Sequence, residues 1–147
     1  IDPLALSKMV KIVLNRNCLI ICCRYCEYGR YFGAPKVRLL LGLFYLFLIK
    51  AIYPEVKTLR DIQCGVKILR RDVAKSIIKK MVLNDYAYDI DLVMRVSRYN
   101  VNVMNVPVEY RYNHESIFFR SDIFSKVLKM IISILRLRIL TLVNKYW

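Results

Sequence analysis

Apolar residues near the start of the chain follow first a helical and then a strand pattern. Residues 4–14 carry apolar side chains at helical spacing, and Asp2 followed by Pro3 is a favourable helix start. The run at residues 19–23 is apolar throughout and contains two isoleucines. Such a run is typical of a buried strand in a parallel sheet.

The middle of the chain continues this alternation of helix and strand. It predicts a loop at 26–35, a helix at 37–53 closed by Pro54, a loop at 55–65, a strand at 66–69, a helix at 73–82 capped by Asp72, and a helix at 88–99. No internal repeat is visible. The order is typical of an α/β domain with a mixed sheet and flanking helices, and 147 residues suffice for one such domain.

Residues 101–112 alternate in the manner of a strand, but the apolar positions change from odd to even numbers along it. This change of register predicts a bulge or bend near Asn105, because an extra residue shifts every later side chain to the other face. Pro107 cannot donate a ladder hydrogen bond, so it favours an edge strand.

The last predicted element is a long helix that begins at Asp122 and ends at about Lys145. One side of this helix is basic, with Lys126, Lys129 and Arg136. The opposite side is apolar, with Leu128, Ile132, Leu135 and Ile139. Arg138 interrupts this division. We expect residues 1–121 to form the domain proper and residues 122–147 to form a helix at a membrane interface.

Composition and charge narrow the class of partner. The chain is 57% hydrophobic but also 24% charged, which excludes a bundle of membrane-spanning helices. The apolar run at 39–49 is shorter than the roughly 20 residues that a span needs, and four Lys or Arg residues interrupt the run at 123–143. Both segments therefore fit an interfacial position, although the run at 39–49 also fits a buried core helix. No signal peptide is visible.

A net charge of +14 requires an anionic partner: nucleic acid, anionic lipid or a phosphorylated substrate. Nucleic-acid binding is disfavoured because the tyrosines are scattered and the arginines do not cluster. Anionic lipid headgroups at a membrane surface fit the apolar segments better.

The chain has five cysteines, at positions 18, 22, 23, 26 and 64. An odd number without a secretory signal favours a reducing compartment. Cys22, Cys23 and Cys26 are closely spaced, but His114 is the only histidine and has no ligand partner nearby in sequence, so a metal site is disfavoured. We expect Cys18, Cys22 and Cys23 to be small apolar residues on or beside the buried strand.

Three short strings occur in an order and spacing that resemble the second half of family-2 glycosyltransferases of the dolichyl- or polyprenyl-phosphate mannosyl- and glucosyltransferase group. They are Arg60-Asp61-Ile62-Gln63-Cys64-Gly65-Val66-Lys67, Tyr88-Asp89-Ile90-Asp91-Leu92, and Asn105-Val106-Pro107-Val108-Glu109-Tyr110 followed by Ser116. Upstream, Cys23-Arg24-Tyr25 is similar to the family's S-R-Y, and Arg38 lies where an arginine opens the next helix. The resemblance implies the acceptor-side, carboxy-terminal half of a GT-A (Rossmann-like) domain.

The chain also departs from the family's pattern. Cys23 replaces a serine, Val66 a phenylalanine, Asp91 and Asn105 glutamates, and Gly42 a helix serine. The family's nucleotide-binding units and its D-x-D motif, which binds Mg²⁺ or Mn²⁺, would precede Ile1. We therefore expect this chain to be truncated relative to the family and inactive alone.

The resemblance implies an inverting enzyme that transfers a hexose from a nucleotide sugar, UDP-glucose or GDP-mannose, to a polyprenyl or dolichyl phosphate at the cytoplasmic face of a membrane. The acceptor phosphate is already anionic, so it needs positioning and charge compensation more than a strong base. Arg24, Arg38 and Lys67 are candidates to bind phosphate, and each could instead be a surface charge.

Four residues are candidates for the reacting centre: Asp61, Gln63, Asp89 and Asp91. Asp61 could contact the donor sugar or assist the acceptor, or it could cap a turn. Because Asp89 and Asp91 point about 200° apart on a helix, only one of them is expected to face the site. The alternative to an enzyme is a catalytically inactive remnant that serves as a membrane-surface binding module.

Overall fold

The computed structural model describes residues 2–85, 87–112 and 123–143. In chain order its elements are α1 (Pro3–Asn15), β1 (Cys18–Cys23), β2 (Arg30–Phe32), α2 (Lys36–Ile52), the 3₁₀ turn η1 (Pro54–Val56), β3 (Lys67–Ile68), α3 (Arg71–Ile78), α4 (Tyr88–Arg98), β4 (Asn102–Pro107), β5 (Glu109–Arg111) and α5 (Ile123–Leu142). The expectations for His114, Ser116, Asp122 and Lys145 fall outside the described residues.

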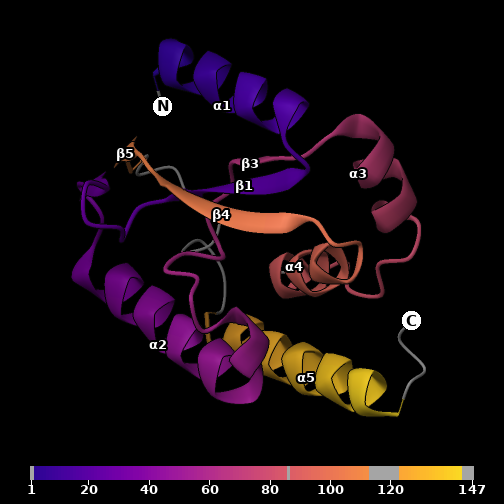
Figure 1. The fold of residues 1–147 in the computed structure, drawn as a ribbon. Coiled ribbons are helices and arrows are strands. Elements are labelled where there is room, and N and C mark those ends of the chain that lie inside the picture. Colours follow the sequence, from indigo (N-terminus) through magenta and orange to yellow (C-terminus); the bar gives the residue numbers. More distant parts are fainter. Residues whose placement is uncertain (1, 86, 113–122, 144–147) are drawn as a thin grey trace.

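A three-stranded sheet with the order β3-β1-β4 lies at the centre of the fold. Figure 1 shows α1 on one side of this sheet and α2, α4 and α5 on the other. β1 pairs in parallel with β4 along its whole length and antiparallel with β3, so the sheet is mixed. The predicted α/β class with flanking helices is confirmed.

The position of β1 in the middle of the sheet explains its sequence. All six residues of β1 are buried, which matches a strand covered on both faces. The first helix was also predicted correctly: the Asp2 side chain accepts a hydrogen bond from the backbone N–H of Leu4 at 3.0 Å, and Pro3 is the first helical residue. The candidate site begins at the carboxyl end of β1.

The prediction for the third helix was wrong at both ends. The helix starts at Arg71 and ends at Ile78, so Asp72 lies inside the first turn and is not the cap. Asp72 instead accepts hydrogen bonds from the Arg70 guanidinium at 2.7 and 3.2 Å. A carboxylate in the first turn is favourable for the helix dipole as well, so the same residue type fits either position.

The predicted bulge at Asn105 was wrong. Every residue from Asn102 to Pro107 pairs in turn with β1, so the pairing is continuous through Asn105 and ends at Pro107. There the chain leaves the first sheet, and β5 pairs in parallel with β2 as a separate two-stranded sheet. β2 lies within the segment expected to be a loop. The edge position of β4 is confirmed.

Helices α2 and α5 each have a buried face and an exposed apolar face. Tyr45 and Ile49 of α2 are buried, as are Met130, Ile134 and Leu137 of α5. The exposed apolar residues are Val37, Leu40, Leu43, Phe44 and Phe47 on α2 and Phe124, Leu128, Ile132, Leu135, Ile139 and Leu142 on α5. The run at 39–49 is therefore partly core and partly exposed surface. It fits neither a wholly buried core helix nor a wholly exposed interfacial segment.

Candidate functional site

The carboxyl end of β1 places Arg24 against a buried carboxylate. Asp61 accepts three hydrogen bonds from Arg24, from the backbone N–H at 3.0 Å, from Nε at 2.8 Å and from Nη2 at 3.0 Å. Burial alone would lower the pKa of Arg24, but the hydrogen bonds and charge of Asp61 outweigh it and raise that pKa above its usual range. The pair is therefore a charged, forked contact inside the protein.

The loop that carries Asp61 is held in turn by Asn105 on β4. The Asn105 side-chain oxygen accepts from the backbone N–H groups of Arg60 at 2.7 Å and Asp61 at 3.3 Å. Its amide group donates to the carbonyl oxygens of Asp61 at 2.9 Å and Ile21 at 3.3 Å. A glutamate side chain has no N–H to donate, so asparagine satisfies this arrangement where glutamate would not.

Replacing Asn105 with aspartate is expected to lower the free energy of unfolding by about 2 kcal/mol at neutral pH. The change turns two donors into an acceptor that faces two carbonyl oxygens, which leaves polar groups unsatisfied. Urea denaturation measures the effect. Asn102→Asp is the control, because Asn102 lies on the same strand with an exposed side chain. Equal effects of the two variants would contradict this role of Asn105.

Tyrosines of the small β2–β5 sheet support both arginines. Tyr31 makes edge-on contacts with Tyr25, Tyr110 and Tyr112, with ring centroids 5.6–6.4 Å apart. The Arg24 guanidinium lies over the rings of Tyr25 and Tyr31, and that of Arg38 lies over Tyr112 at 4.9 Å. Arg38 Nε also donates to the Tyr31 hydroxyl at 2.9 Å. These contacts restrict two guanidinium groups that would otherwise be mobile.

A cavity of about 470 Å³ lies between α2 and α5, with the end of β1 and the start of α4 also contributing to its wall. It is lined by Arg24, Tyr25, Arg38, Leu41, Gly42, Phe44, Tyr45, Leu48, Gln63, Tyr88, Asp89, Val127, Met130 and Ile131. Polar and charged groups therefore share this cavity with apolar side chains of the two helices. Such a combination of apolar walls and a few polar groups is typical of ligand-binding cavities.

One buried hydroxyl in the wall of this cavity has no hydrogen-bond partner among the described residues. It belongs to Tyr45, whose side chain is almost completely buried. Burial raises the pKa of this phenol above its usual range, so the group stays protonated. Buried hydroxyls are nearly always paired, so the Tyr45 hydroxyl is an exception among the buried polar groups of the described residues.

The predicted site residues do not all reach the cavity. Arg24, Arg38, Gln63 and Asp89 line it. Asp61 is 2% exposed and lies behind Arg24, and Lys67 is held by Asp89 at 2.6 Å and by the Cys64 carbonyl at 2.7 Å. These two residues therefore stand behind the cavity wall. The tyrosines of the wall were not among the predicted site residues, and their scattered positions in the sequence gave no signal.

Asp89 and Asp91 lie on different sides of α4. Asp91 accepts hydrogen bonds from the backbone N–H groups of Val82 and Leu83 at 2.6 and 2.8 Å, and Arg95 contacts its other oxygen at 3.1 Å. The string Asp89-Ile90-Asp91 has the letters of a D-x-D motif, but its carboxylates bind different partners. Among the described residues no three His, Cys, Asp or Glu side chains come together as metal ligands.

Burial raises the pKa of Asp89 above its ordinary value, although Lys67 acts in the opposite direction. The folded state therefore holds this proton more tightly than the unfolded state. Between the ordinary pKa of about 4 and the raised one, stability conferred by Asp89 falls as pH rises.

We therefore expect the free energy of unfolding of the wild type, minus that of Asp89→Asn, to decrease as pH rises above about 4. Denaturation curves at a series of pH values measure this difference. For Asp72→Asn the difference should instead increase as pH rises toward about 4 and stay constant above it, because the hydrogen bond from Arg70 lowers the Asp72 pKa. A difference for Asp89 that grows with pH would contradict the effect of burial.

Two of the five cysteines form a disulfide. Cys23 at the end of β1 is bonded to Cys26, while Cys18, Cys22 and Cys64 are free and buried. The expectation that Cys23 is simply a small apolar strand residue was therefore wrong, although it is fully buried. Two residues lie between the two cysteines in sequence, a spacing that a tight turn after a strand can close.

Helices α2 and α5, which both carry exposed apolar side chains, lie on the same side of the sheet, opposite α1 (Figure 1). The two helices are joined by the hydrogen bond from the Tyr53 hydroxyl to the Ile134 carbonyl at 2.8 Å, and by the Arg138–Glu55 ion pair at 3.1 Å. Within the described residues, no helix combines the length and apolar character needed to cross a membrane.

Comparisons with known proteins give one partial similarity. No family model matches the chain, and no solved structure matches it. Over 83 residues, or 56% of its length, the chain is 28% identical to a dolichyl-phosphate beta-glucosyltransferase of Dictyostelium discoideum. It covers 24% of that protein's length, about a quarter. This distant similarity supports a function of the glycosyltransferase type.

Proposed function

We propose that this chain is the acceptor-binding part of a family-2 glycosyltransferase of the GT-A fold, which moves a hexose from a nucleotide sugar to a polyprenyl phosphate at a membrane surface. One observation carries the proposal: a single cavity combines two supported guanidinium groups with apolar walls from α2 and α5. A lipid phosphate has the matching chemistry, an anionic head on an apolar chain. The similarity to a dolichyl-phosphate glucosyltransferase supports the same substrate class.

The arginines would act on the acceptor phosphate by charge and position. Asp61 neutralises Arg24 in part and fixes its direction, whereas Arg38 is oriented by Tyr31 and Tyr112. The phosphate oxygen is already ionised at neutral pH, so the protein needs to orient it rather than remove a proton. The isoprenyl chain would lie along the apolar residues of α2 and α5, which lead from the cavity to the exposed surface.

Asp89 and Gln63 are placed to contact the transferred hexose. Both line the cavity, and Lys67 limits the motion of the Asp89 carboxylate. A carboxylate and an amide can bind sugar hydroxyls. The donor diphosphate and its divalent cation would need ligands other than the described residues.

The membrane surface completes the proposal. The apolar faces of α2 and α5 would enter the interfacial layer on the cytoplasmic side, and exposed Lys129 and Arg136 would lie near anionic headgroups. The same features would serve a binding module that has lost transfer activity. This binding module is the second candidate.

Binding of farnesyl phosphate, compared with farnesol, tests the proposal. Calorimetry on this chain is expected to show that farnesyl phosphate binds at least about tenfold more tightly than farnesol, because two guanidinium groups would face its phosphate. Arg38→Gln should remove most of that preference. Arg136→Gln should leave it unchanged, because Arg136 is exposed on α5 and does not line the cavity. Equal affinity for alcohol and phosphate would overturn the proposal.

Transfer activity separates the enzyme from the binding module. Radiolabelled hexose from UDP-glucose or GDP-mannose is offered with polyprenyl phosphate, both to this chain and to a version extended at its amino terminus by the donor-binding half that the family resemblance implies. We expect labelled lipid only with the longer protein. Acceptor binding without transfer by either protein would support the binding module.

A further inference from the structure

The disulfide between Cys23 and Cys26 encloses two residues of the cavity wall. Arg24 and Tyr25, the residues between the two cysteines, both line the cavity. The strand residue Cys23 is fully buried and fixed in the sheet opposite Pro107. The disulfide therefore links Cys26, at the end of this short turn, covalently to the last residue of β1.

The turn is packed closely against its surroundings. The Tyr25 hydroxyl lies only 2.9 Å from where a Cβ on Gly42 of α2 would be, so a larger residue at position 42 would displace it. On the other side, a Cβ on Gly29 would lie 2.5 Å from the Cys23 carbonyl oxygen. The position of Tyr25 against α2 therefore depends on the path of residues 23–29, and the disulfide restricts that path.

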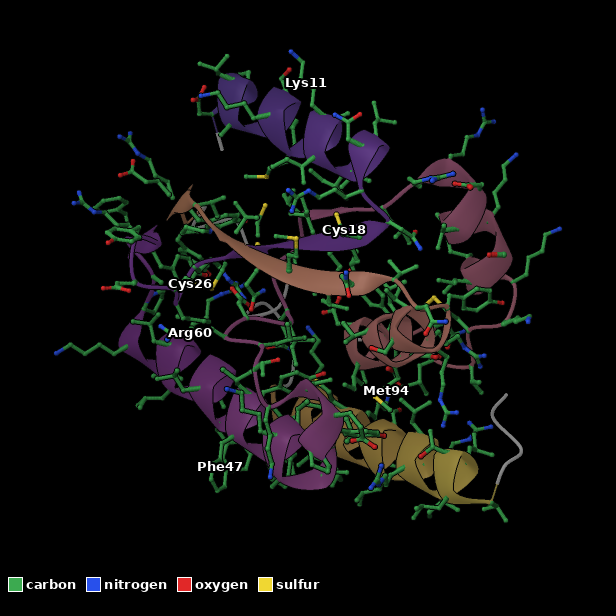
Figure 2. The ribbon with its side chains drawn as sticks, viewed as in Figure 1. Lys11, Cys18, Cys26, Phe47, Arg60 and Met94 are labelled. Carbon is green, nitrogen blue, oxygen red and sulfur yellow. A yellow bond between two sulfur atoms is a disulfide. The ribbon has the colours of Figure 1, made fainter. Side chains whose placement is uncertain are left out.

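Access to the disulfide comes from a second cavity. Cys26 is partly exposed and lines a space of about 400 Å³ together with Tyr28 and Arg60. Figure 2 shows Cys26 and Arg60 beside each other on the side of the sheet that faces α2. This space shares no lining residue with the cavity between α2 and α5. A small thiol can therefore approach Cys26 without competing with a bound ligand.

We propose that Cys23 and Cys26 form a redox control on the proposed acceptor site: the disulfide holds Tyr25, whose ring supports the Arg24 guanidinium, in the binding arrangement, and reduction weakens acceptor binding. This inference rests on the proposed function. Oxidation removes two electrons and two protons from the two thiols and transfers them to a low-molecular-weight disulfide such as glutathione disulfide, which becomes two thiols. Reduction by two thiols reverses the exchange.

The chemistry of the other cysteines makes this exchange selective. Cys18, Cys22 and Cys64 are buried in the core, so reagents in solution reach the Cys26 side first. A disulfide in a protein of a reducing compartment is usually catalytic or redox-sensing rather than structural. The Arg24–Asp61 contact would persist after reduction, so the effect is on the arrangement of the turn and not on the fold.

Binding of farnesyl phosphate to the oxidised and reduced protein tests the inference. If reduction leaves one tenth of the molecules with the turn in the binding arrangement, the apparent Kd rises about tenfold. We expect that change on adding dithiothreitol, and its reversal by glutathione disulfide. Alkylation of the native reduced protein, followed by mass spectrometry, should identify Cys26 as the first residue labelled.

Variants separate this effect from general loss of structure. Cys26→Ser should bind weakly whether or not reductant is present, and Cys18→Ala, at the other end of β1, should respond to reductant as the wild type does. Circular dichroism checks that each state is folded. Equal affinity in the two redox states, with the phosphate still preferred over farnesol, would overturn the redox control alone. Loss of that preference in the oxidised protein would overturn the proposed function as well.

Discussion

Replacing Asp61 with asparagine is expected to lower the free energy of unfolding by about 3 kcal/mol at neutral pH. The substitution leaves the Arg24 guanidinium, whose side chain is 9% exposed, as a buried charge without its counterion. Removing one partner of a buried ion pair typically costs 3–5 kcal/mol, most of it from the charge left behind. Because Asn still accepts a hydrogen bond, the effect should lie at the lower end. Urea denaturation measures it.

Asp72→Asn is the matched control for this experiment. Asp72 also pairs with an arginine, but both side chains are exposed, and surface ion pairs contribute little. The double variant Asp61→Asn with Arg24→Gln should recover part of the lost stability, since it removes the unpaired charge. If Asp61→Asn unfolds no more readily than Asp72→Asn, the buried pair does not hold the end of β1.

Replacing Phe47 and Leu128 together with glutamine is expected to weaken binding to vesicles of phosphatidylcholine and phosphatidylserine about a hundredfold. Phe47 is 71% exposed on α2 and Leu128 is 48% exposed on α5. Each would lose roughly 1.4 kcal/mol of apolar burial in the interfacial layer, and 1.4 kcal/mol is a factor of ten. Co-sedimentation over a range of lipid concentrations measures the partition.

The control places the same change on the opposite side of the molecule. Leu14 on α1 is 68% exposed, and Figure 1 shows α1 on the other side of the sheet from α2 and α5. Leu14→Gln should leave vesicle binding nearly unchanged. A larger loss with Leu14→Gln than with the double variant would place the membrane-binding face on α1.

Much of the fold could be predicted because its signals are local. Asp2 and Pro3 mark the start of α1, Pro54 marks the end of α2, and the uninterrupted apolar run of β1 indicates burial on both faces. Each of these signals acts through neighbouring residues on the backbone itself, so no knowledge of tertiary contacts was needed.

The errors occur where pairing between distant segments decides the structure. β2 has only three residues and becomes a strand because β5 pairs with it from far along the chain. The change of apolar register after Val103 suggested a bulge near Asn105, but β4 pairs with β1 without interruption through Pro107, and the chain then passes to the second sheet. One sequence pattern fits both geometries, and the partner strands decide between them.

The candidate site shows the same limit. Motif strings named Arg24, Arg38, Gln63 and Asp89, and the fold brings these four to one cavity. The strings could not show that Asp61 lies behind Arg24 or that Asp91 binds Val82 and Leu83, because these arrangements depend on how the loops pack. Asn105 looked like a departure from a family pattern, yet it holds the Asp61 loop.

The most direct measurement maps where a lipid phosphate binds. A diazirine-bearing analogue of farnesyl phosphate is cross-linked to the chain by light, and the labelled peptides are identified by mass spectrometry. The account predicts labels on residues of α2 and α5 that line the cavity, such as Phe44, Leu48 and Met130, and protection by farnesyl phosphate but not by farnesol. Labels concentrated on α1, or labelling that farnesol prevents equally well, would contradict it.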